Sequence, residues 1–173
     1  MNEIAKVLEP KEKVIWDGKP KYAPYMISMF FGGLIFGLLL GALAYYFLKS
    51  VLAAVVVGII IFIVAFFFGN LSYKVTHYAL TNKRVIFQSG IIGRDFRSVN
   101  YDDIKNASAK VGLIGLIFHV GDINIFTGEI TSTGGKNQQI APKYDTIQVV
   151  DKPYDVLRLL QKNLSQREEK LYK

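Results

Sequence analysis

The chain of 173 residues contains no cysteine and only two histidines. The lack of cysteine excludes a disulfide scaffold and a thiolate metal site, and His77 and His119 stand apart from other potential metal ligands. The chain also lacks a glycine-rich phosphate loop, and the adjacent Asp102 and Asp103 would point to opposite faces of a strand. We therefore expect no catalytic residue, metal ion, cofactor or small-molecule substrate, and a protein that is not an enzyme.

Charged residues are missing from two long segments, residues 25–48 and residues 51–69. An α-helix rises about 1.5 Å per residue and needs about 20 residues to cross the hydrocarbon core of a bilayer, whereas strands are much shorter. Residues 42–44 imitate a signal-peptide cleavage site, but a long charged segment precedes the first apolar run, and that run continues past the site. The sequence predicts two transmembrane helices.

Only Lys49 and Ser50 separate these two segments, so the helices must form a tight antiparallel hairpin. Five Lys or Arg residues precede the first helix and fifteen follow the second, against Lys49 alone in the turn. The positive-inside rule then predicts a two-pass protein of the cell membrane, with residues 1–24 and the C-terminal domain in the cytoplasm. The spans contain no Asp, Glu, Lys, Arg or His, which disfavours a pore or a transporter.

Small residues recur on one face of the first helix, at Gly33, Gly37 and Gly41. If the turn is centred between residues 49 and 50, positions at equal depth sum to 99, which sets Gly41 opposite Gly58 and Gly33 near Ala65. Faces of this kind let two helix backbones approach closely, within one hairpin or between copies. The sequence leaves both uses open.

Residues 70–165 are expected to form a cytoplasmic domain, with residues 166–173 as a polar tail. Alternating apolar residues separated by glycine or polar turns predict short strands at residues 71–80, 84–88, 94–101, 104–111, 120–126 and 146–150. Residues 112–119 are apolar and turn-like, and residues 127–139 are a polar stretch. This pattern predicts a small, mainly β sandwich or barrel.

One amphipathic helix is expected to close the domain. Pro153 lies in its first turn, and its apolar face consists of Val156, Leu157, Leu160 and Leu164. The predicted architecture is thus a membrane helical hairpin followed by a mainly β-domain with a C-terminal capping helix.

Several of these segments resemble a known family. Residues 78–86 read YALTNKRVI and are followed by Gly90, Ile104, the GLIG of residues 112–115 and the GDI of residues 121–123. They resemble the bacterial pleckstrin-homology-like domains that follow paired transmembrane helices, and residues 8–16 look like the entry segment of that family. The resemblance implies a strongly bent, seven-stranded β-structure with a C-terminal capping helix and no enzymatic activity.

Two hypotheses for function follow. The first is a membrane-anchored interaction module that presents a face or strand edge of its β-domain to a protein partner or to another copy of itself. The alternative is an anionic-lipid-binding or lipid-sensing protein, because basic residues near a bilayer attract acidic head groups. The candidate head-group contacts are Lys74, Lys83, Arg84, Arg94 and Arg97.

An alternative is that these basic residues bind no lipid and only contribute to the positive-inside bias that orients the protein. Phosphoinositide-binding pleckstrin-homology domains carry a basic cluster across the first hairpin, and here only Lys83 and Arg84 stand at that turn. Nucleic-acid binding is not expected, because the excess of positive charge is modest and scattered.

Overall fold

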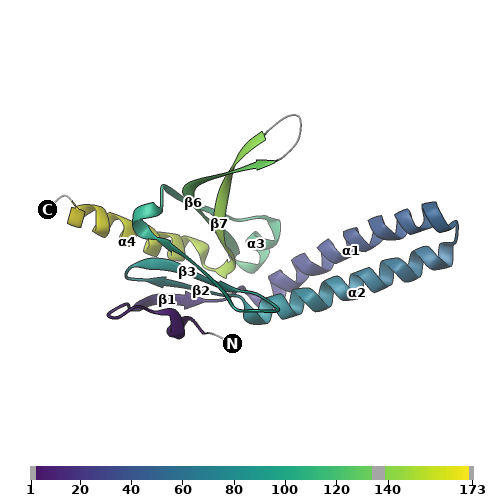
Figure 1. The fold of residues 1–173 in the computed structure, drawn as a ribbon, viewed down its shortest axis with the longest axis horizontal. Helices are drawn as coiled ribbons and strands as arrows, with labels where there is room; N and C mark the ends of the chain where they lie inside the picture. The colour runs from purple at the N-terminus through teal and green to yellow at the C-terminus, as the bar shows by residue number, and fades with distance from the viewer. Residues whose placement is uncertain (1–2, 134–138, 172–173) are drawn as a thin grey trace.

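The computed structural model describes residues 3–133 and 139–171. Two long apolar helices, α1 (Tyr22–Leu48) and α2 (Val51–Val75), project together from one end of a β-domain, as Figure 1 shows. Both are long and apolar enough to cross a membrane. The turn between them is short because Lys49 adopts a left-handed conformation (φ 50°) and the Ser50 hydroxyl caps α2 by accepting a hydrogen bond from the Ala53 amide.

The helix boundaries differ from those expected. Helix α1 begins at Tyr22 instead of residue 25, and α2 continues to Val75 instead of ending at residue 69. The prediction of a strand from residue 71 was therefore wrong for residues 71–75. Tyr73 on this last turn packs against Tyr22 and Tyr25, with ring centroids 4.9 and 5.8 Å apart. Its helical conformation is stabilised by these tertiary contacts, which outweigh a local alternation of apolar residues.

The strands of the described residues form two antiparallel sheets. The first sheet has the order β1 (Val14–Gly18), β2 (His77–Thr81), β3 (Arg84–Ser89) and β4 (Asp95–Asn100). The second has the order β5 (Asn106–Lys110), β6 (Val120–Thr133) and β7 (Gln139–Asp151). Strand β1 comes from the segment before the membrane helices, so that the two sides of the hairpin meet in one sheet.

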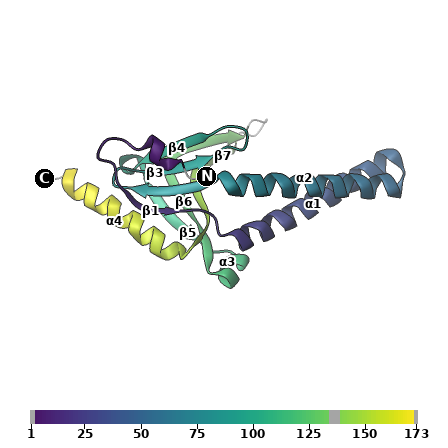
Figure 2. The ribbon, with the colours of Figure 1, turned by 90° about the horizontal axis from the view of Figure 1, so that it is seen from below.

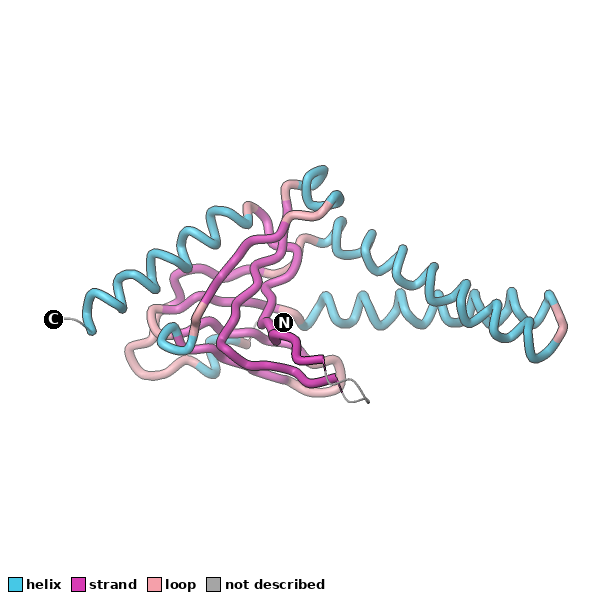
Figure 3. The backbone as a smooth tube through the Cα atoms, turned by 90° about the horizontal axis from the view of Figure 1, so that it is seen from above, coloured by secondary structure: helices cyan, strands magenta, loops and turns pink. Residues whose placement is uncertain are grey.

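The core lies between the two sheets and is closed by α4 (Pro153–Leu171), which runs along one side of the strands in Figure 2. Leu80 of the first sheet and Ile123 of the second are fully buried, together with Leu160 of α4. Burying an aliphatic side chain of this size contributes about 1.5–3 kcal/mol. Figure 3 shows the strands between the membrane hairpin and α4. The predicted architecture is confirmed.

Short helical elements complete the fold: η1 (Ile4–Val7), η2 (Tyr101–Asp103) and α3 (Leu113–Phe118). Ile4 packs on Ala79 and Ile86, so the N-terminal segment covers the outer face of the first sheet. Helix α3 stands where residues 112–119 were interpreted as a turn. Glycine suggested that turn, yet Gly112 precedes the helix and the buried Gly115 lets the helix lie close to Val120.

The last strands and α4 are longer than expected. Strands β6 and β7 extend well beyond residues 120–126 and 146–150, and their register pairs Thr131 with Ala141. Much of the predicted polar stretch is thus strand, while residues 134–138 of it lie outside the described residues. Helix α4 continues to Leu171, so the domain boundary expected at residue 165 falls inside a helix.

Candidate functional site

The three glycines of α1 lie against α2. A Cβ atom added to Gly37 would stand 2.8 Å from the carbonyl oxygen of Gly58, and one added to Gly41 would stand 2.9 Å from that of Ala54. A Cβ on Gly33 would meet the Cβ of Ala65 at 3.5 Å. The helices therefore approach backbone to backbone within one hairpin, which only small residues permit.

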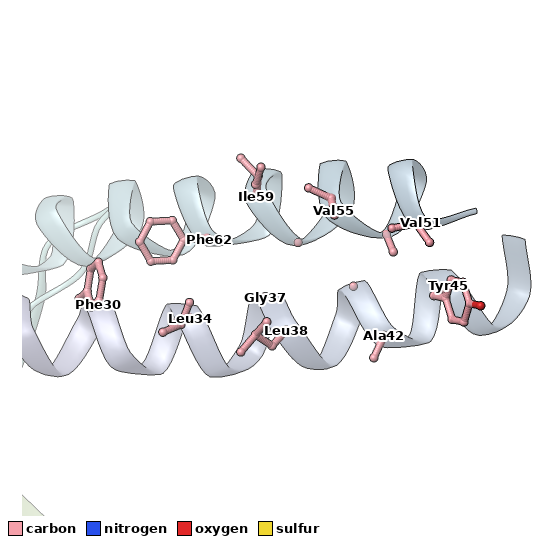
Figure 4. A pocket seen from close by; sticks show the side chains of 13 residues that line it. Phe30, Leu34, Gly37, Leu38, Ala42, Tyr45, Val51, Val55, Ile59 and Phe62 are labelled. Atoms are coloured by element: carbon pink, nitrogen blue, oxygen red, sulfur yellow. The ribbon is translucent and has the colours of Figure 1, made fainter. Parts of the chain in front are cut away.

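One side of the hairpin is hollowed into an apolar groove of about 760 Å³. Figure 4 shows Leu34 and Leu38 of α1 and Val55 and Ile59 of α2 along it. Tyr45 supplies the one polar side chain among the residues that line this groove. Such a surface suits contact with hydrocarbon, since no Asp, Glu, Lys, Arg or His lines it.

The only strongly buried charged pair among the described residues joins Glu12 to Arg84. The Glu12 side chain is fully buried and accepts hydrogen bonds from the Thr81 hydroxyl (2.7 Å) and from Nε and Nη2 of Arg84 (both 3.1 Å). The backbone amide of Glu9 adds a fourth bond at 2.8 Å. The Arg84 side chain is 17% exposed and also donates to the Val7 carbonyl at 2.9 Å. Arg84 thus fastens the segment before α1 to the turn between β2 and β3.

Burial alone would raise the pKa of Glu12, but hydrogen bonds from Arg84, Glu9 and Thr81 together with the Arg84 charge hold that pKa below its ordinary value. A carboxylate whose pKa is lowered by folding stabilises the fold above its ordinary pKa, and this contribution is lost as the pH falls through the folded-state pKa.

We therefore expect the difference in melting temperature between the wild type and the Glu12→Gln variant to shrink on acidification from neutral pH to below 4.5, the ordinary pKa. Glutamine keeps the shape of the side chain and cannot titrate, and its loss of one acceptor oxygen does not depend on pH, so the pH dependence of the difference reports the titration of Glu12. Thermal unfolding of the full-length protein in detergent, followed by circular dichroism, measures both curves. A difference that stays constant over this range would contradict the prediction.

The other predicted head-group contacts are also placed by the structure. Lys83 pairs with Glu9 at 2.7 Å, and Arg94 pairs with Glu3 at 3.1 Å. Arg97 pairs with Glu129 at 3.1 Å and with Asp145 at 2.8 Å, and Lys74 lies in the last turn of α2. The three carboxylates of residues 3, 9 and 12 precede the first membrane helix, so local sequence around the basic residues did not reveal these pairs.

These five basic residues do not share one surface. Strand β2 starts one residue after α2 and runs away from it for five residues, or about 16 Å, before the turn that carries Lys83 and Arg84. Arg97 lies opposite Phe87 in the middle of β4, the edge strand of the first sheet. Only Lys74 and Arg94 belong to the end of the domain nearest the membrane helices.

The residues considered for chemistry in the sequence serve structural contacts. Asp102 pairs with Arg167 at 2.7 Å, and Asp103 accepts a hydrogen bond from the Asn100 amide at 3.2 Å. His119 ends α3 in a left-handed conformation. Within residues 3–133 and 139–171, no three His, Asp or Glu side chains are grouped so that they could hold a metal ion.

A free strand edge is provided by the β6–β7 ribbon, which we define as residues 127–133 of β6 and residues 139–144 of β7. Pairing between β5 and β6 ends at Phe126, and β7 is the edge of its sheet, so both outer edges of the described ribbon lack a strand partner. The ribbon projects from the domain in Figure 1. Ile130 and Tyr144 on it are 64% and 48% exposed. This surface was not predicted, because residues 127–139 were interpreted as a polar stretch.

Comparison with known proteins relates this arrangement to a family. The family model described as "Bacterial PH domain" matches residues 33–167, which include most of α1, all of α2, strands β2 to β7 and most of α4. Residues 8–16, interpreted above as a family entry segment, lie outside the match. No curated protein shows significant similarity to the chain.

One similar solved structure is a DUF1696 family protein with a pleckstrin-homology domain from Shewanella loihica PV-4. It is 20% identical, the alignment covers 53% of this chain and 68% of that chain, and the TM-score is 0.30, too low to support an inference. The family match alone spans well over half of the sequence. This chain belongs to the bacterial PH domain family.

Proposed function

We propose that the protein is a two-pass membrane protein that holds its PH domain at the cytoplasmic face, where the β6–β7 ribbon binds an extended segment of a partner protein. The membrane location is supported by the two apolar helices, and the orientation by the excess of Lys and Arg on both flanks of the hairpin. Only Thr76 separates α2 from β2. The domain therefore stays close to the bilayer and is available to partners there.

The free edges of the ribbon carry this proposal. An unpaired strand edge exposes backbone N–H and C=O groups that can add a further strand, while exposed side chains beside it provide selectivity. Ile130 and Tyr144 supply apolar contacts, and the ion pair between Glu129 and Lys143 (2.8 Å) crosses the ribbon between its two strands. A partner segment of alternating apolar and polar residues fits such an edge.

Binding suits the family better than catalysis, because PH domains are generally non-enzymatic. Binding of anionic lipid through the predicted basic residues is less well supported. Lys83, Arg84, Arg94 and Arg97 are each engaged with carboxylates, and the first two lie at the far end of β2 from the membrane helices. Lys74 and Arg94 keep this alternative open to test.

A photo-crosslinking amino acid placed at Tyr144 or Ile130 should capture a partner protein in living cells. The matched control is Tyr154 on α4, which is comparably exposed at 63% but lies off the ribbon. Adducts specific to the ribbon positions, identified by mass spectrometry, would support the proposal. Adducts with the mass of two copies would indicate self-association through the ribbon. Equal or absent adducts at all three positions would contradict strand addition at this edge.

A further inference from the structure

Helix α3 exposes an apolar face. Leu113, Leu116 and Ile117 are 83%, 65% and 73% exposed, and their spacing places them on one side of the helix. All six residues of α3 are apolar. A helix that faced water would carry polar side chains here, so this face is suited to an apolar environment.

Helix α3 lies beside the start of α1, as Figure 2 shows. The ammonium group of Lys21 donates to the Phe118 carbonyl at 3.2 Å, and Pro24 and Ser28 of α1 line a cavity together with Leu113. Helix α3 therefore runs at the level of the first two turns of α1.

This level corresponds to the interface of a bilayer. About 20 residues of each helix fill the hydrocarbon core, and counting them from the turn reaches Met29 on α1 and Asn70 on α2. The side chain of Met29 meets Gly69, which confirms that these depths match. The rings of Tyr22, Tyr25 and Tyr73 gather just beyond this boundary, where aromatic residues are typical of the head-group layer.

A second apolar element flanks α2. The turn between β3 and β4 contains Ile91 and Ile92, and Ile92 is 99% exposed. Gln88 pairs with His77, the first residue of β2, and its side chain donates to the Val75 carbonyl at 3.2 Å. Residues beyond Gln88 therefore continue past the start of β2, alongside the last turn of α2.

We propose that α3 and the β3–β4 turn are two apolar anchors that insert into the interfacial layer of the bilayer on either side of the hairpin. Leu113, Leu116 and Ile117 form one anchor, and Ile91 and Ile92 form the other. The bilayer is the one environment that reaches both anchors, because each anchor lies beside a different membrane helix at the point where that helix leaves the hydrocarbon core. Lys21 beside α3 pairs with Asp151 at 3.0 Å, and Arg94 beside the turn pairs with Glu3 at 3.1 Å, so the apolar side chains carry this contact.

This docking goes beyond strand addition at the ribbon and does not depend on it. It restricts the orientation of the domain, because contacts on two sides of the hairpin oppose both rotation and tilting.

The test uses nitroxide labels on the full-length protein, which has no native cysteine. Single-cysteine variants Leu116→Cys and Ile92→Cys report on the anchors, and Val14→Cys is the control. Val14 is also apolar and exposed, but it lies opposite Thr81 at the far end of the sheet. Labelled proteins are placed in nanodiscs of phosphatidylcholine, and collision rates with oxygen and with a water-soluble nickel chelate are compared by electron paramagnetic resonance.

We expect oxygen, which concentrates in the bilayer, to dominate at residues 92 and 116, and the nickel chelate to dominate at residue 14. Nickel accessibility at an anchor equal to that at residue 14 would overturn the proposal. Shielding from both reagents with spin–spin broadening would assign the surface to a second copy instead. Insertion only after addition of phosphatidylglycerol would show that head-group charge, and not the apolar side chains, drives the contact.

Discussion

Replacing Glu12 with alanine should lower the free energy of unfolding of the β-domain by about 3 kcal/mol, the lower end of the range for removing one partner of a buried ion pair. Four hydrogen bonds converge on the Glu12 carboxylate, and the variant leaves Arg84 and Thr81 without their main acceptor. We expect a value at the lower end of this range for two reasons. Arg84 is partly exposed to water, and its Nη1 lies 3.8 Å from the carboxylate of Glu9. Chemical denaturation of the full-length protein in detergent measures the change.

The Glu129→Ala variant is the matched control. Glu129 also meets two cations, Arg97 and Lys143, but its side chain is 50% exposed. Pairs in water contribute about 0–1 kcal/mol, so the control should be nearly as stable as the wild type. If both variants lost the same stability, the burial of Glu12 would not be the source of the effect. If neither did, the segment before α1 would not stabilise the domain.

Fold class and the depths at which residues of the two membrane helices face each other could be predicted because their signals are local. Two uncharged segments joined by a turn of two residues can only form an antiparallel hairpin. The hairpin then determines which positions of the two helices lie at the same depth in the membrane. Gly41 therefore lies against Gly58, at the depth that the sequence indicates. The apolar face of the C-terminal helix could also be predicted, since Val156 and Leu160 are buried as their spacing indicates.

The ion-paired contacts could not be predicted because their partners are distant in sequence. Strand β1 is five residues long, its sequence VIWDG does not alternate between apolar and polar residues, and it pairs with a strand beyond both membrane helices. Glu12 reaches Arg84 across 72 positions. The sequence does not indicate which carboxylate will pair with a given basic residue. The five candidate head-group contacts were therefore grouped together, although the fold places them on different parts of the domain.

The apolar anchors were missed for a different reason. Residues 112–119 contain two glycines that favour a turn, and the segment was interpreted as an apolar turn. The structure exposes three of its apolar side chains because α3 lies beside a membrane helix. Periodicity identifies residues that avoid water, but it does not distinguish the interior of a protein from the interior of a bilayer.

Replacing Gly37 with valine should separate the two membrane helices and destabilise their association by roughly 1–3 kcal/mol, the usual cost of overpacking. The new Cβ would stand 2.8 Å from the Gly58 carbonyl oxygen, and a backbone atom of a packed helix cannot move aside as a flexible side chain can. Both helices must shift to relieve the contact. Unfolding in mixed micelles of increasing dodecyl sulfate content measures the stability of the hairpin.

Gly32→Val is the control, because a Cβ at Gly32 would have no atom within 4 Å in this structure. It adds the same side chain to the same helix five residues away, so any cost of valine itself is shared by both variants. Equal stability of the two would mean that the glycine face does not join the helices of one chain. If Gly37→Val instead dissociated an oligomer while the hairpin of each copy kept its stability, the same face would serve contacts between copies. A selective loss of hairpin stability in Gly37→Val assigns the glycines to packing within the chain, since only that contact brings residue 37 against the Gly58 backbone.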